Sequence, residues 1–233
     1  MTPTLLIPGL ACTAALFRDQ VGALNAFGPV HIADHRGADT IGDLAANILK
    51  TAPSHFRLCG LSMGGYIAFE IWRQAPERVT HMALLDTSAR PDTPEGTQKR
   101  KDAIALCRKG QYLRVIKEGI PNLLTEEHAR TASMRERVIE MAEDCGSQGY
   151  IAQQMANATR PDSRPTLSTI TVPTLVLVGE HDVLTPEPLA VEIVEGIGAH
   201  AELEVLQQAA HLTPLEQPLA VRAALTEFFA RYP

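Results

Sequence analysis

Gly60-Leu61-Ser62-Met63-Gly64-Gly65 is the stretch that decides the fold of this 233-residue chain. Residues 56–59 before it form an apolar run of strand length, and residues 67–75 after it carry apolar side chains at helical spacing. Glycines on both sides of the serine let two backbone segments approach closely, which predicts a sharp turn between a strand and a helix. Such a turn would lift Ser62 above the sheet edge in a strained conformation that costs about 1–3 kcal/mol.

Two other interpretations apply to the same turn. In the first, the glycines merely form a tight connection in which Ser62 caps the helix. In the second, the stretch is a phosphate-binding loop, but that loop needs Gly-x-Gly-x-x-Gly spacing, which is absent. A strand before the turn, a helix after it and glycines on both sides together favour a serine placed for nucleophilic chemistry.

The rest of the chain repeats the alternation of strand-like and helix-like segments. The helical stripes include residues 67–75, which end at Pro76, and residues 221–229 near the C-terminus. This alternation predicts the α/β class, with a mostly parallel sheet of about six strands flanked by helices. The apolar runs that we predict as strands are residues 5–7, 30–33, 56–59, 79–85, 175–178 and 203–206.

A long segment without strand-like runs separates the fourth and fifth predicted strands. Its apolar residues recur at helical spacing, and prolines mark both of its ends. We therefore predict a helical cap insertion over residues 91–165, with residues 1–90 and 166–233 forming the core.

Serine is a weak nucleophile, so Ser62 requires a base within hydrogen-bond reach. Functional groups of a parallel sheet collect at the carboxyl ends of its strands, so the best candidates directly follow apolar runs. Among the eight histidines, His211 follows the last predicted strand and precedes a helix, which favours it as the base. His35 also follows a predicted strand and is the second candidate.

The base needs a carboxylate that orients it, and two aspartates are placed for this role. Asp182 lies at the carboxyl end of the 175–178 run, and Thr185 after it is predicted to cap the next helix. Asp86 also ends a strand, and the chain order of serine, acid and histidine is compatible with both. We favour Asp182 because of its full loop context, with Asp86 as a structural residue bonded to nearby turn N–H groups.

Composition and charge narrow the classes of function. The formal net charge of −6 provides no basic surface for nucleic acid, and the one dense basic run, residues 99–101, is expected on a solvated helix face. Four widely spaced cysteines and the lack of a leader-like N-terminus indicate reduced thiols in the cytoplasm. No apolar stretch is long enough to cross a membrane.

The sequence resembles the α/β-hydrolase superfamily, and more closely its small esterase-like serine hydrolases with a helical cap. Three stretches carry the resemblance: residues 6–10, residues 60–65, and residues 173–182 continued by 211–218. The resemblance implies an oxyanion hole made by the backbone N–H groups of Leu10 and Met63. This chain departs from the pattern at Pro8, where many relatives have histidine, and at Ala210, where glycine often precedes the histidine. The N-terminal β-hairpin of larger relatives is also expected to be missing.

Taken together, these features predict hydrolysis of a carboxylic ester of a small or medium apolar substrate by Ser62, His211 and Asp182 through an acyl-enzyme. We expect no metal and no organic cofactor, and the oligomeric state is not indicated. The same triad would also serve a lactonase, an acyltransferase or an enzyme that acts on a carbon–carbon bond. A ligand-binding relative with little turnover is the alternative of another class. Candidate apolar pocket residues in the cap, which could equally be its own core, are Met134, Met141, Tyr150 and Met155.

Overall fold

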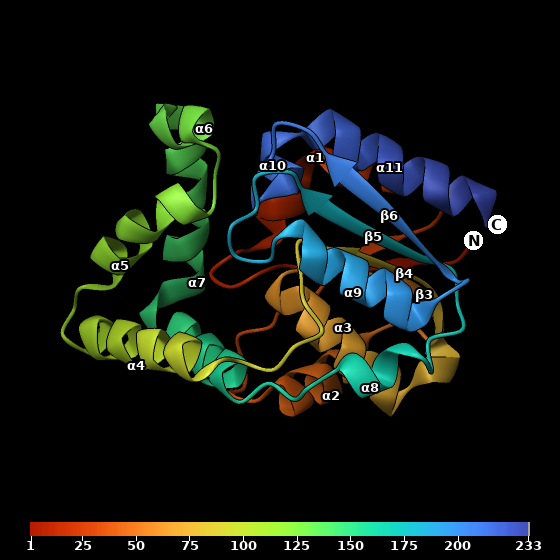
Figure 1. Cartoon of the computed structure of the whole chain (residues 1–233), viewed down its shortest axis with the longest axis horizontal. Coiled ribbons are helices and arrows are strands. Elements are labelled where there is room, and N and C mark those ends of the chain that lie inside the picture. Colours follow the sequence, from red (N-terminus) through yellow and green to blue (C-terminus); the bar gives the residue numbers. More distant parts are fainter. Residues whose placement is uncertain (233) are drawn as a thin grey trace.

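A six-stranded parallel sheet forms the centre of the molecule, with the strand order β2-β1-β3-β4-β5-β6 (Figure 1). The computed structural model describes residues 1–232. All neighbouring strands pair in parallel, which confirms the predicted fold class. The strands are β1 (Thr4–Ile7), β2 (Val30–Ile32), β3 (Phe56–Leu61), β4 (Val79–Leu85), β5 (Thr174–Gly179) and β6 (Ala201–Leu206).

Helices cover both faces of the sheet, and short 3-10 turns precede or link some of them. The 3-10 turns are η1 (Ala14–Phe17), η2 (Pro76–Arg78) and η3 (Ile120–Asn122). The helices around the sheet are α1 (Arg18–Leu24), α2 (Ile41–Thr51), α3 (Met63–Gln74), α8 (Arg164–Leu167), α9 (Glu187–Ile197), α10 (Thr213–Glu216) and α11 (Pro218–Arg231). None of the helices within residues 1–232 is long and apolar enough to span a bilayer.

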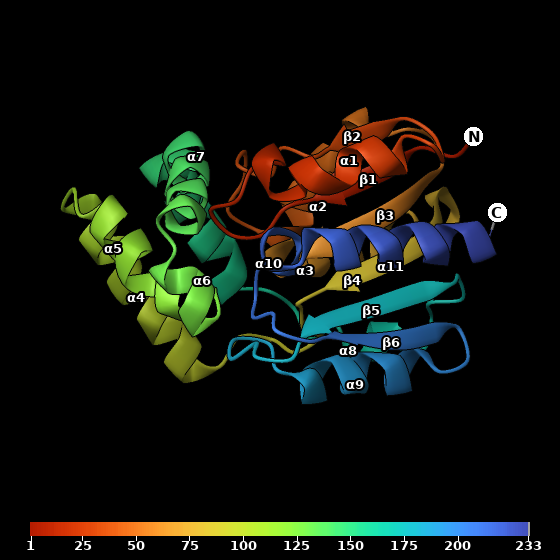
Figure 2. The ribbon, with the colours of Figure 1, turned by 90° about the horizontal axis from the view of Figure 1, so that it is seen from above.

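Side chains along the strands alternate between two apolar layers, as the two-residue period of a strand requires. Leu5 and Ile7 of β1 lie in the layer covered by α2, α3 and α9, whereas Leu6 lies in the layer covered by α1 and α11 (Figure 2). In β4, Met82 and Leu84 also face the first layer. The sheet is buried on both faces, which explains the nearly continuous apolar runs of its strands.

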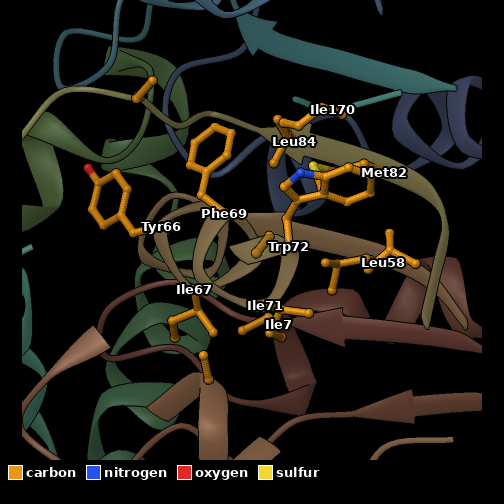
Figure 3. Packing of buried hydrophobic residues seen from close by; sticks show 14 of the residues in the cluster. Ile7, Leu58, Tyr66, Ile67, Phe69, Ile71, Trp72, Met82, Leu84 and Ile170 are labelled. Atoms are coloured by element: carbon orange, nitrogen blue, oxygen red, sulfur yellow. The ribbon is translucent and has the colours of Figure 1, made fainter. Parts of the chain in front are cut away.

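Helix α3 is anchored in the first layer (Figure 3). Phe69 and Ile71 are fully buried, and the Nε1–H of Trp72 donates a hydrogen bond of 2.9 Å to Thr169 Oγ1. Burying a large apolar side chain contributes about 1.5–3 kcal/mol. The turn at the start of α3, where Ser62 lies, is therefore held by packing that extends well beyond the turn itself.

The strand order places a crevice at the edge of the sheet that is formed by the carboxyl ends of its strands. Strand β1 has β2 on one side and β3 on the other, so the chain leaves β1 in one direction and later returns past it. The loops that follow β1 and β3 consequently diverge at the carboxyl ends of these strands. Open α/β sheets bind their ligands at such a switch point.

Four further helices, which we call the cap, lie over this edge of the sheet. Figures 1 and 2 show them at the end toward which the strand arrowheads point. Residues 86–173, all of them described by the structure, contain no strand. The cap helices are α4 (Pro94–Arg108), α5 (Tyr112–Gly119), α6 (Glu126–Arg130) and α7 (Ala132–Ala158), with a kink in α7 at Gly146.

Candidate active site

The turn between β3 and α3 holds Ser62 in an unusual backbone conformation, with φ of 54° and ψ of −111°. Non-glycine residues rarely adopt a positive φ, so the surroundings must enforce it. A Cβ on Gly64 would lie 2.1 Å from the carbonyl oxygen of Ile7, and one on Gly60 would lie 2.3 Å from the carbonyl oxygen of Gly64. Only glycine fits at either position, which is the close approach that the sequence predicts.

His211 lies in the loop after β6, and its ring faces Ser62. The distance between His211 Nε2 and Ser62 Oγ is 2.9 Å, and the His211 residue is only 4% exposed. Main-chain contacts hold the loop: His211 N–H donates to the carbonyl of Leu123 in the cap, and Ala210 N–H donates to Glu216 Oε2 at 2.7 Å. The alanine that replaces the usual glycine therefore keeps its N–H bonded.

Asp182 follows β5 and faces the other side of the imidazole. Its Oδ2 lies 2.8 Å from His211 Nδ1, and its Oδ1 accepts hydrogen bonds from the backbone N–H groups of Leu184 and Thr185. The Thr185 hydroxyl donates to Asp182 Oδ2 at 2.7 Å. Thr185 is not the helix cap that we predicted, because α9 begins after Pro186 and the threonine bonds to the carboxylate instead.

The electrostatics of the pair match this geometry. Burial opposes the charged form of Asp182, but the positive charge and hydrogen bond of His211 outweigh burial and lower the pKa of the carboxyl. Burial alone would lower the pKa of His211, yet the charge and hydrogen bond of Asp182 raise it above the ordinary histidine value. The carboxylate thus orients the ring with a proton on Nδ1, so that the unprotonated Nε2 faces the Ser62 hydroxyl.

The two competing candidates from the sequence lie elsewhere. Asp86 ends β4, but its oxygens bond to Gly179 N–H at 3.0 Å and to the Thr213 hydroxyl at 2.5 Å rather than to the histidine ring. Burial, followed by the nearby negative charge of Asp182, raises the pKa of Asp86 well above its ordinary value. His35 donates from Nε2 to the carbonyl of Gly9 at 2.9 Å, and burial lowers its pKa. Asp86 and His35 therefore support neighbouring loops.

The two backbone N–H groups predicted for the oxyanion hole have different surroundings. Leu10 lies on the wall of the pocket above Ser62, whereas the Met63 side chain is fully buried in the core. Neither N–H donates a hydrogen bond to another residue within positions 1–232. The next residue, Ala11, has a φ of 57°, and its N–H donates at 2.9 Å to Gln153 Oε1 in the cap. Sequence reasoning missed Gln153, which ties the cap to this loop.

A pocket of about 620 Å³ opens above Ser62 and His211 between the sheet edge and the cap. Of the four cap residues predicted to form its wall, the structure places Met141 and Tyr150 there. Met155 is 37% exposed instead, because five residues after Tyr150 it lies about 140° around the helix. Met134 packs into the apolar layer under α1 and α11, one to two turns before the lining part of α7.

One side of the pocket is polar, and sequence reasoning missed it. We call its residues the polar wall: Asp92, Arg100, Gln154, Asn157 and Arg160. The basic run 99–101 was expected to face solvent throughout, but Arg100 turns inward because it pairs with Asp92 at 3.1 Å. A partial signal existed in the sequence, since positions 150, 154 and 157 share one helix face. Within residues 1–232, no cluster of three or more His, Cys, Asp or Glu side chains is arranged to hold a metal ion.

Comparison with known proteins shows similarity over most of the chain. Residues 35–218 match the profile of the family described as serine aminopeptidase, S33. The solved structure of a thermophilic esterase from Thermogutta terrifontis superposes with a TM-score of 0.87 and 29% sequence identity, over 99% of this chain and 90% of the esterase.

Two curated relatives are similar over most of their length. The 3-oxoadipate enol-lactonase 2 of Acinetobacter baylyi is 28% identical over 210 residues, covering 88% of this chain and 73% of the lactonase. The pimeloyl-acyl-carrier-protein methyl ester esterase of Neisseria meningitidis serogroup B is 27% identical over 237 residues, covering 96% of this chain and 91% of the esterase. The similarity therefore includes the cap as well as the sheet.

Proposed function

This chain belongs to the α/β-hydrolase family described as serine aminopeptidase, S33, and from that membership we propose that it is a serine hydrolase acting on a carboxylic ester. The observation that carries the proposal is the continuous chain of hydrogen bonds from Asp182 through His211 to Ser62 at the floor of the pocket. Each residue comes from a loop at the carboxyl edge of the sheet, where this fold places its reactive groups.

In the proposed reaction, Ser62 Oγ attacks the ester carbonyl while His211 Nε2 takes its proton. The negative charge that develops on the carbonyl oxygen is stabilised by the N–H groups of Leu10 and Met63. The tetrahedral intermediate then collapses, and the protonated His211 donates its proton to the departing alcohol, which leaves an acyl group on Ser62. Water attacks this acyl-enzyme with His211 again as the base, and the acid is released.

The pocket supports an ester rather than a peptide with a free N-terminus. An aminopeptidase needs a carboxylate that is free to bind the substrate ammonium group. Asp92 is the one acidic side chain that lines the pocket in the described part of the chain, and its two oxygens are engaged by Arg100 and Arg160. A cationic substrate end would also face the two guanidinium groups, which disfavours it.

Ring opening of a lactone is the second candidate for this site. The relative from Acinetobacter baylyi is an enol-lactonase, and the same triad steps apply to a lactone, with the alcohol remaining attached to the acid.

The four cysteines are buried and unpaired, which supports a reducing compartment such as the cytoplasm.

The test is the variant Ser62→Ala, assayed with 4-nitrophenyl esters, a lactone series and an amino acid 4-nitroanilide. We expect the wild-type protein to cleave esters fastest and Ser62→Ala to lose at least about 10⁴-fold in kcat. The matched control is Ser54→Ala, an exposed serine in the loop before β3. A fluorophosphonate probe should label Ser62. Full activity of Ser62→Ala would overturn the proposal, and an unlabelled protein without turnover would favour a ligand-binding role.

A further inference from the structure

We propose that the polar wall binds a carboxylate group of the substrate, so that the preferred substrates are esters whose acyl or alcohol part carries a second, ionised carboxyl group. The inference rests on the proposed ester hydrolysis and specifies its substrate class. It departs from the apolar substrate that the sequence alone favours.

The charges of the polar wall do not balance. Burial opposes ionisation of Asp92, but Arg100 and Arg160 outweigh it and lower its pKa, so the carboxyl is charged at neutral pH. Two guanidinium groups and one carboxylate leave one net positive charge. The Asp92 and Arg160 side chains are 5% and 9% exposed, so this charge is only weakly screened by water. Lys99 also lines the pocket and adds to the positive potential.

Arg100 is the member with free donors. A guanidinium has five N–H groups. Arg100 uses one at Nε and one at Nη2 toward Asp92, and one at Nη1 toward Gln154 Oε1 at 2.7 Å. Its remaining two N–H groups make no bond to residues 1–232, and its side chain is 20% exposed. Two N–H groups on one planar guanidinium suit a carboxylate, which accepts two parallel hydrogen bonds.

Asn157 provides a second, independent indication of a ligand. Asn157 is only 2% exposed, and it lines the same pocket. Its side-chain Oδ1 is buried and has no hydrogen-bond partner among the described residues. Buried polar groups are almost always satisfied, so this unpaired amide indicates a polar partner in the pocket. Because Oδ1 only accepts hydrogen bonds, it does not itself bind a carboxylate. The amide Nδ2 also makes no hydrogen bond to residues 1–232, and it is the group of Asn157 that can donate to a substrate carboxylate.

The polar wall and the proposed nucleophile belong to one continuous pocket. The guanidinium carbon of Arg160 lies 4.6 Å from the centre of the Tyr66 ring, and Tyr66 follows Ser62 by one turn of α3. Tyr66 and Ser62 both line the pocket. An ester seated at Ser62 therefore extends past the tyrosine ring toward the polar wall, where its far end meets the arginines.

The two arginines have different roles. Arg160 donates to the backbone carbonyls of Arg90 and Pro91 at 3.0 and 3.2 Å. It therefore also fixes the segment that leads from β4 into the first helix of the cap. Arg100 makes no hydrogen bond to the backbone of residues 1–232 and pairs only with side chains. A substitution at Arg100 therefore tests ligand binding with little effect on the fold.

The experiment measures binding in the Ser62→Ala background, where turnover does not interfere. Calorimetry compares monomethyl adipate with methyl hexanoate for a carboxylate on the acyl side, and O-butyryl glycolate with ethyl butyrate for one on the alcohol side. We expect at least about tenfold tighter binding of the charged member in one of these pairs. Arg100→Gln should remove that preference, Arg100→Lys should restore part of it, and the control Lys101→Gln, an exposed cation on the same helix, should keep it.

Equal binding of charged and neutral members in both pairs would overturn the inference, as would a preference that Arg100→Gln leaves unchanged. Inorganic phosphate serves as a competing probe, and binding as tight as that of the monoester would also overturn the assignment to a carboxylate. The wild-type protein is assayed in parallel by proton release from the same esters. Selective binding without any turnover would contradict the proposed hydrolysis alone, so the two failures are distinguishable.

Discussion

The carboxyl edge of the sheet and the polar wall of the cap face the same pocket, but different kinds of bond hold them. At the sheet edge, main-chain groups position the side chains: Asp182 accepts hydrogen bonds from the N–H groups of Leu184 and Thr185. In the cap, side chains hold one another, as when Asp92 pairs with two arginines. The sheet edge therefore tolerates change in most neighbouring side chains, whereas the polar wall depends on pairing among its own side chains.

The sharpest test at the sheet edge compares the same substitution at the ends of two adjacent strands. Asp182→Asn should lower kcat about 10⁴-fold, because the amide no longer holds His211 in the tautomer that accepts the Ser62 proton. Asp86→Asn should change kcat less than about tenfold, because Asp86 bonds to the Gly179 N–H and the Thr213 hydroxyl rather than to the histidine ring. Steady-state kinetics on a 4-nitrophenyl ester measures both. A larger loss at Asp86 would reverse the assignment of the acid.

The pH dependence tests the electrostatics of the same edge. His211 must be neutral to accept a proton, so kcat/KM should fall about tenfold per pH unit once the pH drops below its pKa. Because Asp182 raises that pKa, the fall should begin above the ordinary histidine value of 6.5. In the Asp182→Asn variant the pKa of His211 should be lower, so the fall of the residual kcat/KM should begin at a lower pH than in the wild type. An unchanged limb would mean that another group titrates.

The link between the two regions predicts an intermediate effect. Gln153→Ala removes the side-chain oxygen that accepts a hydrogen bond from the Ala11 N–H. Ala11 follows Leu10, so the oxyanion loop should shift and kcat should fall about tenfold. The unpaired N–H should also cost about 1–3 kcal/mol in the free energy of unfolding. The control Gln148→Ala, an exposed residue on the same helix, should leave both unchanged. Loss of stability with full kcat would limit Gln153 to a structural role.

The smallest effects on catalysis are expected from the methionines of α7. Met141 lines the pocket and is 1% exposed, so Met141→Ala should alter the preference for acyl chain length several-fold and destabilise the protein by about 2–5 kcal/mol. Met155→Ala should stay within twofold in kcat/KM and about 0.5 kcal/mol in stability, because the side chain faces solvent. Thermal unfolding and an ester series measure both, and equal effects would contradict the helix orientation.

The comparison also explains which parts of the molecule the sequence predicts. The strands and the positions of Ser62, Asp182 and His211 follow from local patterns, because a parallel sheet brings its strand ends to one edge whatever the loops contain. The role of Thr185 did not follow, since its hydroxyl could cap a helix or bond a carboxylate and only the fold decides between them.

The cap was less predictable for a related reason. Periodicity identifies the helix that carries Met134, Met141 and Met155, but the rotation of that helix depends on its neighbours and on the kink at Gly146. The inward turn of Arg100 depends on Asp92, which precedes the helix, and on Gln154, which lies on a different one. Pairings between distant side chains leave little trace in the spacing of a single sequence.

The carbonyl of Leu123 limits how the cap can be exchanged between relatives. It accepts the N–H groups of both His211 and Leu212, at 3.1 and 3.2 Å. A chimaera that kept the sheet but took its cap from another hydrolase would leave these two donors unpaired unless the graft restored a carbonyl at the same point. The cap is therefore not a modular lid, and recombination or directed evolution that aims at new specificity should retain the segment around Leu123 with the parent sheet.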